Sequence, residues 1–142
     1  MKAKQLSIFL ENKVGRLAEV TDVLGDKDIN IRALSLADTS DFGVLRLIVD
    51  DPDRAEKALR EDGYTVSITE VIAVKVPDKP GGLSRVLKSF ADLEVNVEYM
   101  YAFAGKNGDN AVVVFRVDDP ERAIPILQQH GVALLTEDEI YQ

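Results

Sequence analysis

Apolar residues recur at every second position in several short segments of the chain. Leu6–Leu10 and Ile72–Val76 show this spacing most clearly, with apolar side chains at both ends and in the middle. A period of two indicates a strand that places one face in a core. Two further strand pairs are predicted, at Ile29–Ala37 with Phe42–Val49 and at Val95–Phe103 with Ala111–Val117.

A different spacing follows each of the two first strands. Between Leu83 and Phe90 the apolar residues fall at i, i+3, i+4 and i+7, which places them on one face of a helix. Leu17–Leu24 has the same pattern in a shorter form. One amphipathic helix is therefore predicted after each first strand.

An aspartate followed by a proline predicts where a second helix begins in each half of the chain. These pairs are Asp51-Pro52 and Asp119-Pro120. Aspartate at the N-cap accepts a hydrogen bond from a helix N–H, and proline suits the first helical position because the N–H there has no intrahelical partner.

The chain contains an internal sequence repeat. A shift of 66 residues aligns Asn12–Ile31 with Asp78–Val97 and gives six identities in 20 positions. A shift of 68 aligns Val49–Leu59 with Val117–Leu127 and gives seven identities in 11. Because the shift grows by two, the second half has two extra residues, which we expect within Gly105–Asn110.

Each half predicts the order strand, helix, strand, strand, helix, strand. A half has about 70 residues, which is close to the lower limit of independent stability. The closing strand of the first half, Thr65–Thr69, runs into the next strand at Val71 with no Gly, Pro or Ser spacer. We therefore expect two domains, residues 1–70 and 71–142, that pair with each other.

Composition excludes several classes of function. With 46% hydrophobic and 30% charged residues, the chain has the composition of a folded soluble protein. Its formal charge of -8 repels phosphate polyanions and anionic lipid headgroups, so we expect no nucleic-acid partner. The absence of cysteine and the single histidine exclude thiolate and multi-histidine metal sites.

No segment is apolar over the length that a membrane span requires. The longest uninterrupted apolar run, Ala111–Phe115, is far shorter than the ~20 residues of a transmembrane helix. Near the N-terminus, Glu11–Lys13 interrupts the apolar segment Leu6–Leu10, and no small-residue cleavage site follows. We expect a cytoplasmic protein with no membrane association.

Both halves carry a glycine motif directly after the first strand and an asparagine at the start of the second. The glycine motifs are Gly15-Arg16-Leu17 and Gly81-Gly82-Leu83. The asparagine motifs are Ile29-Asn30-Ile31 and Val95-Asn96-Val97. Together with the order of the elements, these motifs resemble the ACT domain, and the resemblance covers nearly the whole chain as two units in tandem.

The resemblance implies an α+β fold of two ferredoxin-like βαββαβ units side by side, forming an eight-stranded antiparallel sheet with four helices on one face. It also implies a small-molecule site, usually for an amino acid, where the units pair. In the family, the strand–helix turn of one unit faces the start of strand two of its neighbour. The corresponding residues are Asn12, Val14, Gly15 and Leu17 with Asn96, and Asp78, Pro80, Gly81 and Leu83 with Asn30.

The residue types at these positions suit a free amino acid. Unpaired N–H groups at a helix start bind a carboxylate, and Gly15 and Gly81 allow the backbone to approach a ligand closely. Asn12 or Asp78 can accept a hydrogen bond from an ammonium group. Because Asn12 is neutral and Asp78 is charged, we expect the two sites to differ.

Structural roles for the same residues stay open at this point. Asparagine and aspartate are common turn and cap residues, and a glycine can serve only a backbone angle. Asn30 and Asn96 could equally end a helix in the left-handed conformation. Leu17 and Leu83 are expected chiefly in the core, with at most an edge on the pocket.

The resemblance implies an amino-acid-sensing regulatory protein, without catalysis or cofactor, that modulates a separate metabolic enzyme. We also expect a homodimer or higher oligomer. A small hydrolase resembling acylphosphatase is an alternative, in which Arg16 would cradle an anion and Asn12 would hold a water. A ligand-free structural adaptor is the third possibility.

Overall fold

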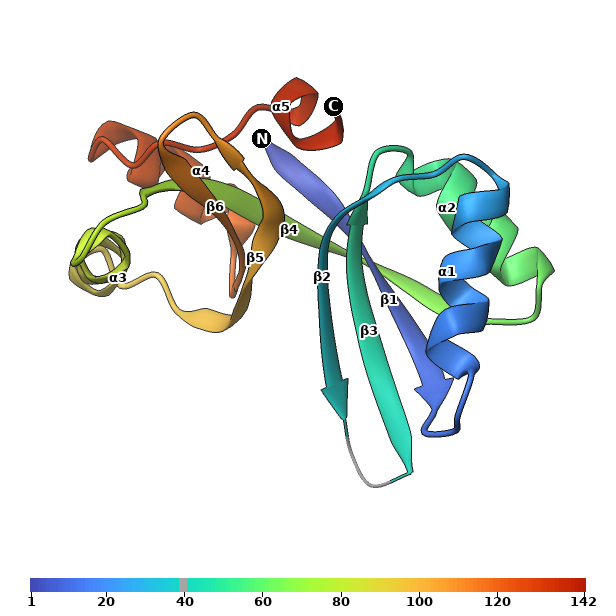
Figure 1. Cartoon of the computed structure of the whole chain (residues 1–142). Coiled ribbons are helices and arrows are strands. Elements are labelled where there is room, and N and C mark those ends of the chain that lie inside the picture. The colour runs from blue at the N-terminus through green and yellow to red at the C-terminus, as the bar shows by residue number, and fades with distance from the viewer. Residues whose placement is uncertain (39–40) are drawn as a thin grey trace. The chain divides into compact units, whose positions relative to one another are not determined.

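A computed structural model describes residues 1–38 and 41–142, and Asp38 is described by its backbone alone. The elements are β1 (Lys2–Glu11), α1 (Arg16–Asp26), β2 (Ile31–Asp38), β3 (Phe42–Val49), α2 (Pro52–Glu61), β4 (Thr65–Pro77), α3 (Gly82–Asp92), β5 (Val97–Asn107), β6 (Asn110–Val117), α4 (Pro120–Gln129) and α5 (Glu137–Tyr141) (Figure 1). Each helix of this described part is too short or too polar to cross a bilayer.

The chain divides into two compact units. The N-terminal unit consists of Lys4–Thr69 with Tyr141, and the C-terminal unit consists of Met1–Ala3, Glu70–Ile140 and Gln142. The assignment of residues 1–70 and 71–142 to two separate ACT domains stays a prediction.

The described residues form six strands, so the prediction of an eight-stranded sheet is wrong. The expected closing strand of the first half and the first strand of the second half are one strand, β4, because nothing in Thr65–Pro77 interrupts the extended backbone. The last expected strand is reduced to a bridge between Val74 and Leu134. Its backbone stops pairing there because Thr136 caps helix α5 directly afterwards.

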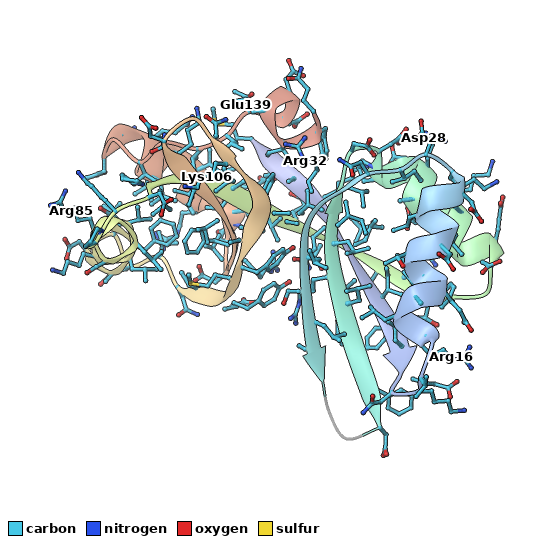
Figure 2. The ribbon with its side chains drawn as sticks, in the orientation of Figure 1. Arg16, Asp28, Arg32, Arg85, Lys106 and Glu139 are labelled. Atoms are coloured by element: carbon cyan, nitrogen blue, oxygen red, sulfur yellow. The ribbon has the colours of Figure 1, made fainter. Side chains whose placement is uncertain are left out.

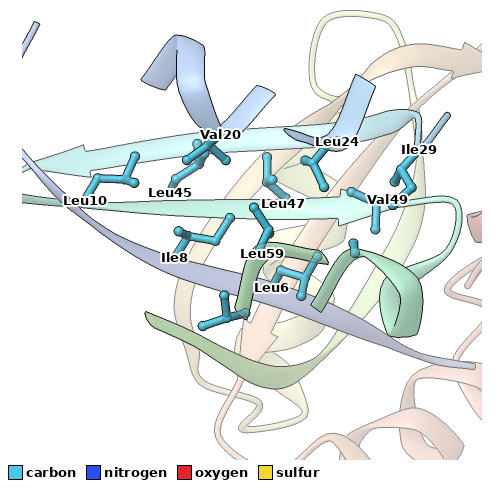
Figure 3. Close-up of a cluster of buried hydrophobic side chains, with 12 residues drawn as sticks. Leu6, Ile8, Leu10, Val20, Leu24, Ile29, Leu45, Leu47, Val49 and Leu59 are labelled. Atoms are coloured by element: carbon cyan, nitrogen blue, oxygen red, sulfur yellow. The ribbon is translucent and has the colours of Figure 1, made fainter. Parts of the chain in front are cut away.

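In the N-terminal unit, β3 lies between β1 and β2 and is antiparallel to both. Leu47 of β3 pairs with Leu6 of β1 on one side and with Leu34 of β2 on the other. Helices α1 and α2 both pack on one face of these strands, where their buried side chains meet every second residue of β1 and β3 (Figure 3). The core consists of Leu6, Ile8, Leu10, Val20, Leu24, Ile29, Leu45, Leu47, Val49, Ala55, Leu59 and Val66.

The C-terminal unit repeats this arrangement with β6 between β4 and β5. Ile72 of β4 pairs with Phe115 of β6. The Phe115 ring packs at a tilt against the Phe90 ring of α3, with ring centroids 4.8 Å apart. Ala123 and Leu127 bring α4 into the same core. Each unit therefore has its own hydrophobic core beneath two helices.

The two Asp-Pro helix starts are confirmed. The Asp51 carboxylate accepts a hydrogen bond from the Arg54 N–H at 3.3 Å, and the Asp119 carboxylate accepts one from the Arg122 N–H at 3.2 Å. Helices α2 and α4 begin directly after these aspartates. The aspartates therefore serve as caps, as the pattern predicts.

The hairpin of the C-terminal unit is irregular near its turn. Asn107 pairs with Asn110 around a turn in which Gly108 has φ of 60°. The register of β5 and β6 shifts between Ala102 and Lys106. This irregular part of the hairpin overlaps Gly105–Asn110, and the place of the two extra residues stays a prediction.

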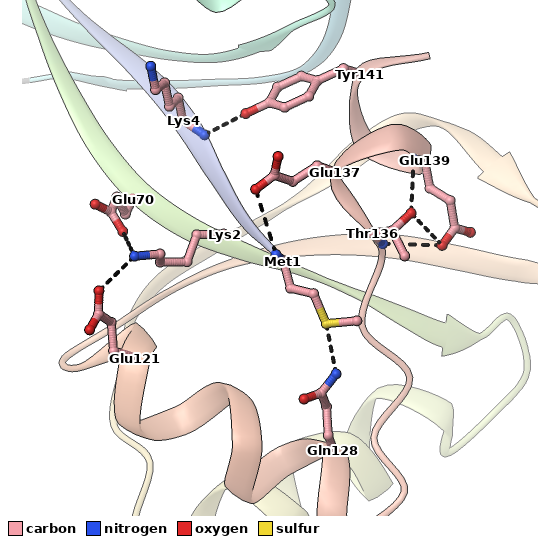
Figure 4. A network of polar contacts seen from close by, with 10 residues as sticks. All are labelled: Met1, Lys2, Lys4, Glu70, Glu121, Gln128, Thr136, Glu137, Glu139 and Tyr141. Carbon is pink, nitrogen blue, oxygen red and sulfur yellow. Dashed lines mark hydrogen bonds and ion pairs between the residues drawn. The ribbon is translucent and has the colours of Figure 1, made fainter.

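The first residues of the chain belong to the C-terminal unit through polar contacts (Figure 4). The Lys2 ammonium lies 2.9 Å from the Glu70 carboxylate and 2.7 Å from the Glu121 carboxylate. The hydrogen bonds that Lys2 donates, first to Glu121 and then to Glu70, raise the pKa of Lys2. The Met1 amino group lies 3.8 Å from the Glu137 carboxylate of α5.

Candidate functional site

Two equivalent turns connect a first strand to a first helix, one in each unit. In both turns a glycine precedes the helix in the left-handed conformation, with φ of 89° at Gly15 and 84° at Gly81. Only glycine adopts this conformation without steric cost, which explains its presence at both positions. Unlike α2 and α4, neither α1 nor α3 has a side-chain cap at its start.

The two turns also share their backbone hydrogen bonds. The Lys13 N–H donates to the Glu11 carbonyl at 2.8 Å, and the Lys79 N–H donates to the Pro77 carbonyl at 2.9 Å. The repeat therefore conserves the backbone path of the turn although the side chains differ.

Each turn is tied to the neighbouring hairpin of its own unit. The Asn12 N–H donates to the Asp41 carbonyl at 3.0 Å, and the Asp78 N–H donates to the Asp109 carbonyl at 3.3 Å. These bonds fix the two predicted polar residues beside the helix start. Their backbone geometry is thus set before any ligand binds.

Both helix starts present unpaired amide groups. The N–H groups of Leu17 and Ala18 in α1, and of Leu83 and Ser84 in α3, find no acceptor among the described residues. Such groups, at the positive end of a helix dipole, are favourable partners for a carboxylate. Each turn can therefore supply two donors to an anionic group.

The turn of the N-terminal unit is surrounded by charged side chains. The Glu11 carboxylate lies 2.8 Å from the Lys13 ammonium and 3.9 Å from the Arg16 guanidinium. The hydrogen bond from Lys13 lowers the pKa of Glu11, and the charge of Arg16 lowers it further. Arg16 also lies 3.2 Å from the Glu19 carboxylate.

A pocket of about 230 Å³ lies beside this turn and includes two of the predicted site residues, Asn12 and Leu17. The remaining wall is formed by Leu10, Glu11, Lys13, Arg16, Leu36 and Gly43. Val14 is fully exposed, at 107% relative accessibility, and does not line this pocket. The volume is near the lower end for small-molecule sites.

The turn of the C-terminal unit carries an ion pair that the sequence pattern did not predict. The Lys106 ammonium, from the end of β5, contacts the Asp78 carboxylate. Pro80 and Gly81 are exposed beside this pair. A ligand ammonium at Asp78 would therefore compete with Lys106 for the same carboxylate.

The expectation that Leu17 and Leu83 lie chiefly in the core is wrong. Their exposed fractions are 42% and 37%. Both residues lie in the first turn of their helix, ahead of the buried residues that begin at Val20 in α1. Beside the uncapped helix starts, they provide apolar surface rather than core packing.

The alternative that Asn30 and Asn96 end a helix in the left-handed conformation does not hold. Among the described non-glycine residues, positive φ occurs at Asp28, at 58°, and at Glu94, at 55°. Asn30 instead exchanges hydrogen bonds with Asp50, whose carboxylate accepts from the Asn30 N–H at 3.0 Å. Asp28 and Glu94, each two positions before an asparagine, therefore have the left-handed conformation at the helix end.

Within the N-terminal unit, Asn30 lies at the opposite end of α1 from Asn12, because it follows the helix while Asn12 precedes it. The unit by itself does not bring these two side chains together. The facing pairs of Asn12 with Asn96 and of Asp78 with Asn30 stay predictions.

Sequence reasoning missed several residues at the two turns. Leu36 and Gly43 line the pocket from β2 and β3, and the periodicity of these strands carried no signal for a ligand site. Arg16 was considered only as the anion cradle of the hydrolase alternative, and its contacts with Glu11 and Glu19 were not predicted. Lys106 lies in the segment where the two extra residues are expected. The sequence predicted that this segment is irregular, but not that Lys106 contacts Asp78.

The ACT domain pair model matches residues 1–142. Protein BT0572 from Bacteroides thetaiotaomicron is 47% identical over 100% of this chain and 97% of that protein, with a TM-score of 0.93. The ligand-free regulatory subunit of aspartate kinase from Thermus thermophilus is 15% identical over 90% of this chain and 92% of that subunit, with a TM-score of 0.63. The corresponding subunit from Thermus flavus is 16% identical over 89% of this chain and 90% of that subunit, with a TM-score of 0.58.

The chain belongs to the ACT domain pair family. ACT domains are regulatory, and the two aspartate kinase subunits are regulatory subunits that share the fold. No curated protein matches the chain. The ACT units have the α+β arrangement of strands and helices described above.

Proposed function

We propose that this protein binds a free amino acid at its strand–helix turns and thereby modulates a separate metabolic enzyme. The observation that supports the proposal best is that α1 and α3 begin in the same way, directly after Gly15 and Gly81 and without a side-chain cap. Membership of a family of regulatory domains supports the absence of catalysis.

The chemistry of a free amino acid matches the groups at each turn. Its carboxylate would accept from the amides of Leu17 and Ala18 in one unit, or from those of Leu83 and Ser84 in the other. Its ammonium would bind Asn12 or Asp78, with Asn96 or Asn30 as the proposed facing residue. A charged acceptor makes the stronger hydrogen bond, so the Asp78 site is proposed to hold the ammonium more tightly.

The position of Arg16 does not favour the alternative of a small hydrolase. An anion cradle needs a cation free to bind the substrate, whereas Arg16 contacts Glu19 at 3.2 Å and Glu11 at 3.9 Å. Two carboxylates beside the guanidinium would repel an acyl phosphate. The adaptor alternative predicts that no free amino acid binds.

A thermal-shift screen of the full chain against each standard amino acid tests the proposal. A ligand that binds only the folded state raises its stability by about 2.7 kcal/mol at a hundredfold excess over Kd. We expect one amino acid, or one chemical class, to raise Tm while the others do not. If none does at millimolar concentration, the adaptor alternative replaces the sensor.

Calorimetry on variants then locates the binding site. Asn12→Ala and Asp78→Ala should each weaken one class of sites, because each removes an acceptor for the ammonium. Asp92→Ala is the matched control for Asp78→Ala, because Asp92 is an exposed aspartate at the end of α3, away from the turn. Unchanged affinity in both folded variants would place the site elsewhere.

A further inference from the structure

Each unit contains a further pocket in an equivalent place, between the start of its first helix and the turn that follows its second helix. The pocket in the N-terminal unit has a volume of about 400 Å³, and its counterpart in the C-terminal unit has about 290 Å³. The repeat shifts of 66 and 68 relate most of their lining residues. Differences between them are therefore differences at the same place in the same fold.

The pocket of the N-terminal unit is crossed by the protein's own polar contacts. The Glu19 carboxylate lies 3.2 Å from the Arg16 guanidinium, and the Tyr64 hydroxyl donates to it at 3.2 Å. Burial, and then this bond to Glu19, raise the pKa of Tyr64. Glu11 and Asp62 add two more carboxylates, so acidic groups outnumber basic ones in the lining.

The same positions in the C-terminal unit cannot form this network. Gly82 replaces Arg16, Arg85 replaces Glu19 and Val132 replaces Tyr64. The Arg85 side chain projects outward from α3 (Figure 2), and its guanidinium makes no ion pair with any residue that the structure describes. Where the N-terminal unit has the paired carboxylate of Glu19, the C-terminal unit thus has the Arg85 guanidinium, which has no ion-pair partner among the described residues.

Other polar side chains line this second pocket, but Arg85 supplies its positive charge. Lys75 and His130 line it, and the Nδ1 atom of His130 lies 2.9 Å from the Ile126 carbonyl, which leaves Nε2 for another partner. Lys75 is neutralised by Glu139 at 3.0 Å, so the uncompensated charge comes chiefly from Arg85. None of the described lining residues is acidic.

We propose that this basic pocket, lined by Lys75, Arg85, Ser89, Asn110, His130 and Val132, binds a small dianion such as a phosphate monoester or a dicarboxylate. The planar guanidinium of Arg85 suits two-point binding of either oxyanion. Asn110 supplies a further polar group, whereas the Ser89 hydroxyl donates to the Arg85 carbonyl at 3.2 Å. Val86 and Val132 supply apolar surface for a short carbon skeleton. In a chain of formal charge -8, such a pocket is a local exception.

This dianion site is separate from the amino-acid site proposed at the turns. Its lining shares none of the proposed binding residues Asp78, Pro80, Gly81 and Leu83. Binding of a dianion here can therefore succeed or fail independently of amino-acid binding.

Titration of the ¹⁵N-labelled full chain, followed by NMR at constant ionic strength, tests the site with two probes, inorganic phosphate and succinate. We expect saturable shifts of the amides within Arg85–Ser89 and His130–Ala133. Saturation by phosphate alone would identify a phosphate ester as the ligand class, and saturation by succinate alone would identify a dicarboxylate. Shifts that grow linearly with both probes, or that lie elsewhere, would overturn the proposal.

Two substitutions in α3 separate a specific site from general charge attraction. Arg85→Gln should weaken binding of the saturating probe at least tenfold, and Arg85→Glu, which restores the charge found at Glu19, should abolish it. Lys88→Gln removes the same charge from an exposed position of α3 outside the pocket and should change the affinity less than twofold. Equal effects of Arg85→Gln and Lys88→Gln would reduce the site to an adventitious ion only.

Discussion

The Glu139 carboxylate lies 3.0 Å from the Lys75 ammonium and joins helix α5 to the C-terminal part of β4. Its other oxygen accepts from the Thr136 N–H at 3.2 Å and completes a capping box at the start of α5. The hydrogen bond from Lys75, followed by that from Thr136, lowers the pKa of Glu139 from 4.5 to about 2. One carboxylate therefore supports both a helix start and a long-range ion pair.

This lowered pKa predicts a loss of stability in acid. A carboxyl group with a lower pKa in the folded state binds fewer protons than the unfolded chain does, so its stabilisation is present above pH 4.5 and is lost as the pH falls towards about 2. Glu139→Gln should therefore flatten the decline of the urea midpoint between pH 5 and pH 2.5. Glu137→Gln, on the same helix with its side chain 66% exposed, is the control and should leave the decline unchanged.

The contact between Lys106 and Asp78 predicts competition with a bound ammonium. Lys106→Gln frees the Asp78 carboxylate, so the affinity for the amino acid identified by the screen should rise. Asp78→Asn keeps the shape but removes the charge, and it should lower the affinity about tenfold. Calorimetry on both variants checks this, and a fall in affinity with Lys106→Gln would contradict the role given to Asp78.

Two helical glycines should respond oppositely to alanine. A Cβ at Gly82 would lie 2.0 Å from the Pro77 carbonyl oxygen, a backbone atom that cannot move aside cheaply. Gly82→Ala should therefore lower the free energy of unfolding by about 1–3 kcal/mol. A Cβ at Gly25 meets nothing within 4 Å, so Gly25→Ala should raise stability by up to about 1 kcal/mol. Chemical denaturation of the two variants measures both effects.

Equivalent leucines in the second helices should be about equally important to the two cores. Leu59 and Leu127 are both fully buried, and each truncation to alanine should cost about 2–5 kcal/mol. Leu36, which is 52% exposed, is the control, and Leu36→Ala should cost less than about 1 kcal/mol. A similar loss at Leu36 would show that this leucine is covered in solution.

The repeated local features could be read from the sequence because each depends on neighbouring residues. Asp51-Pro52 and Asp119-Pro120 predicted two helix starts, since capping involves only the first helical turn. Gly15 and Gly81 marked turns that need a positive φ. The ACT resemblance followed from these features and their spacing, and the family match confirms it.

The side-chain partners at the candidate site were beyond reach of the sequence. Asp78 and Lys106 are 28 positions apart and meet only because β5 extends beyond its counterpart in the first half. The exposure of Leu17 and Leu83 depends on which turns of each helix the strands of the sheet cover. Periodicity identifies the face of a helix but not the point at which the facing strands stop covering it.

By itself, the sequence determined the two-fold repeat, the order of its elements and the backbone of the two turns, since all of these follow from local conformational preferences. Only the tertiary structure decided that β4 is one continuous strand, that the last strand is reduced to a bridge, and that Lys2 pairs with Glu121. Lys2 and Glu121 are 119 positions apart. Such contacts depend on strand pairing and packing between distant segments, whose free energy exists only once the chain has folded.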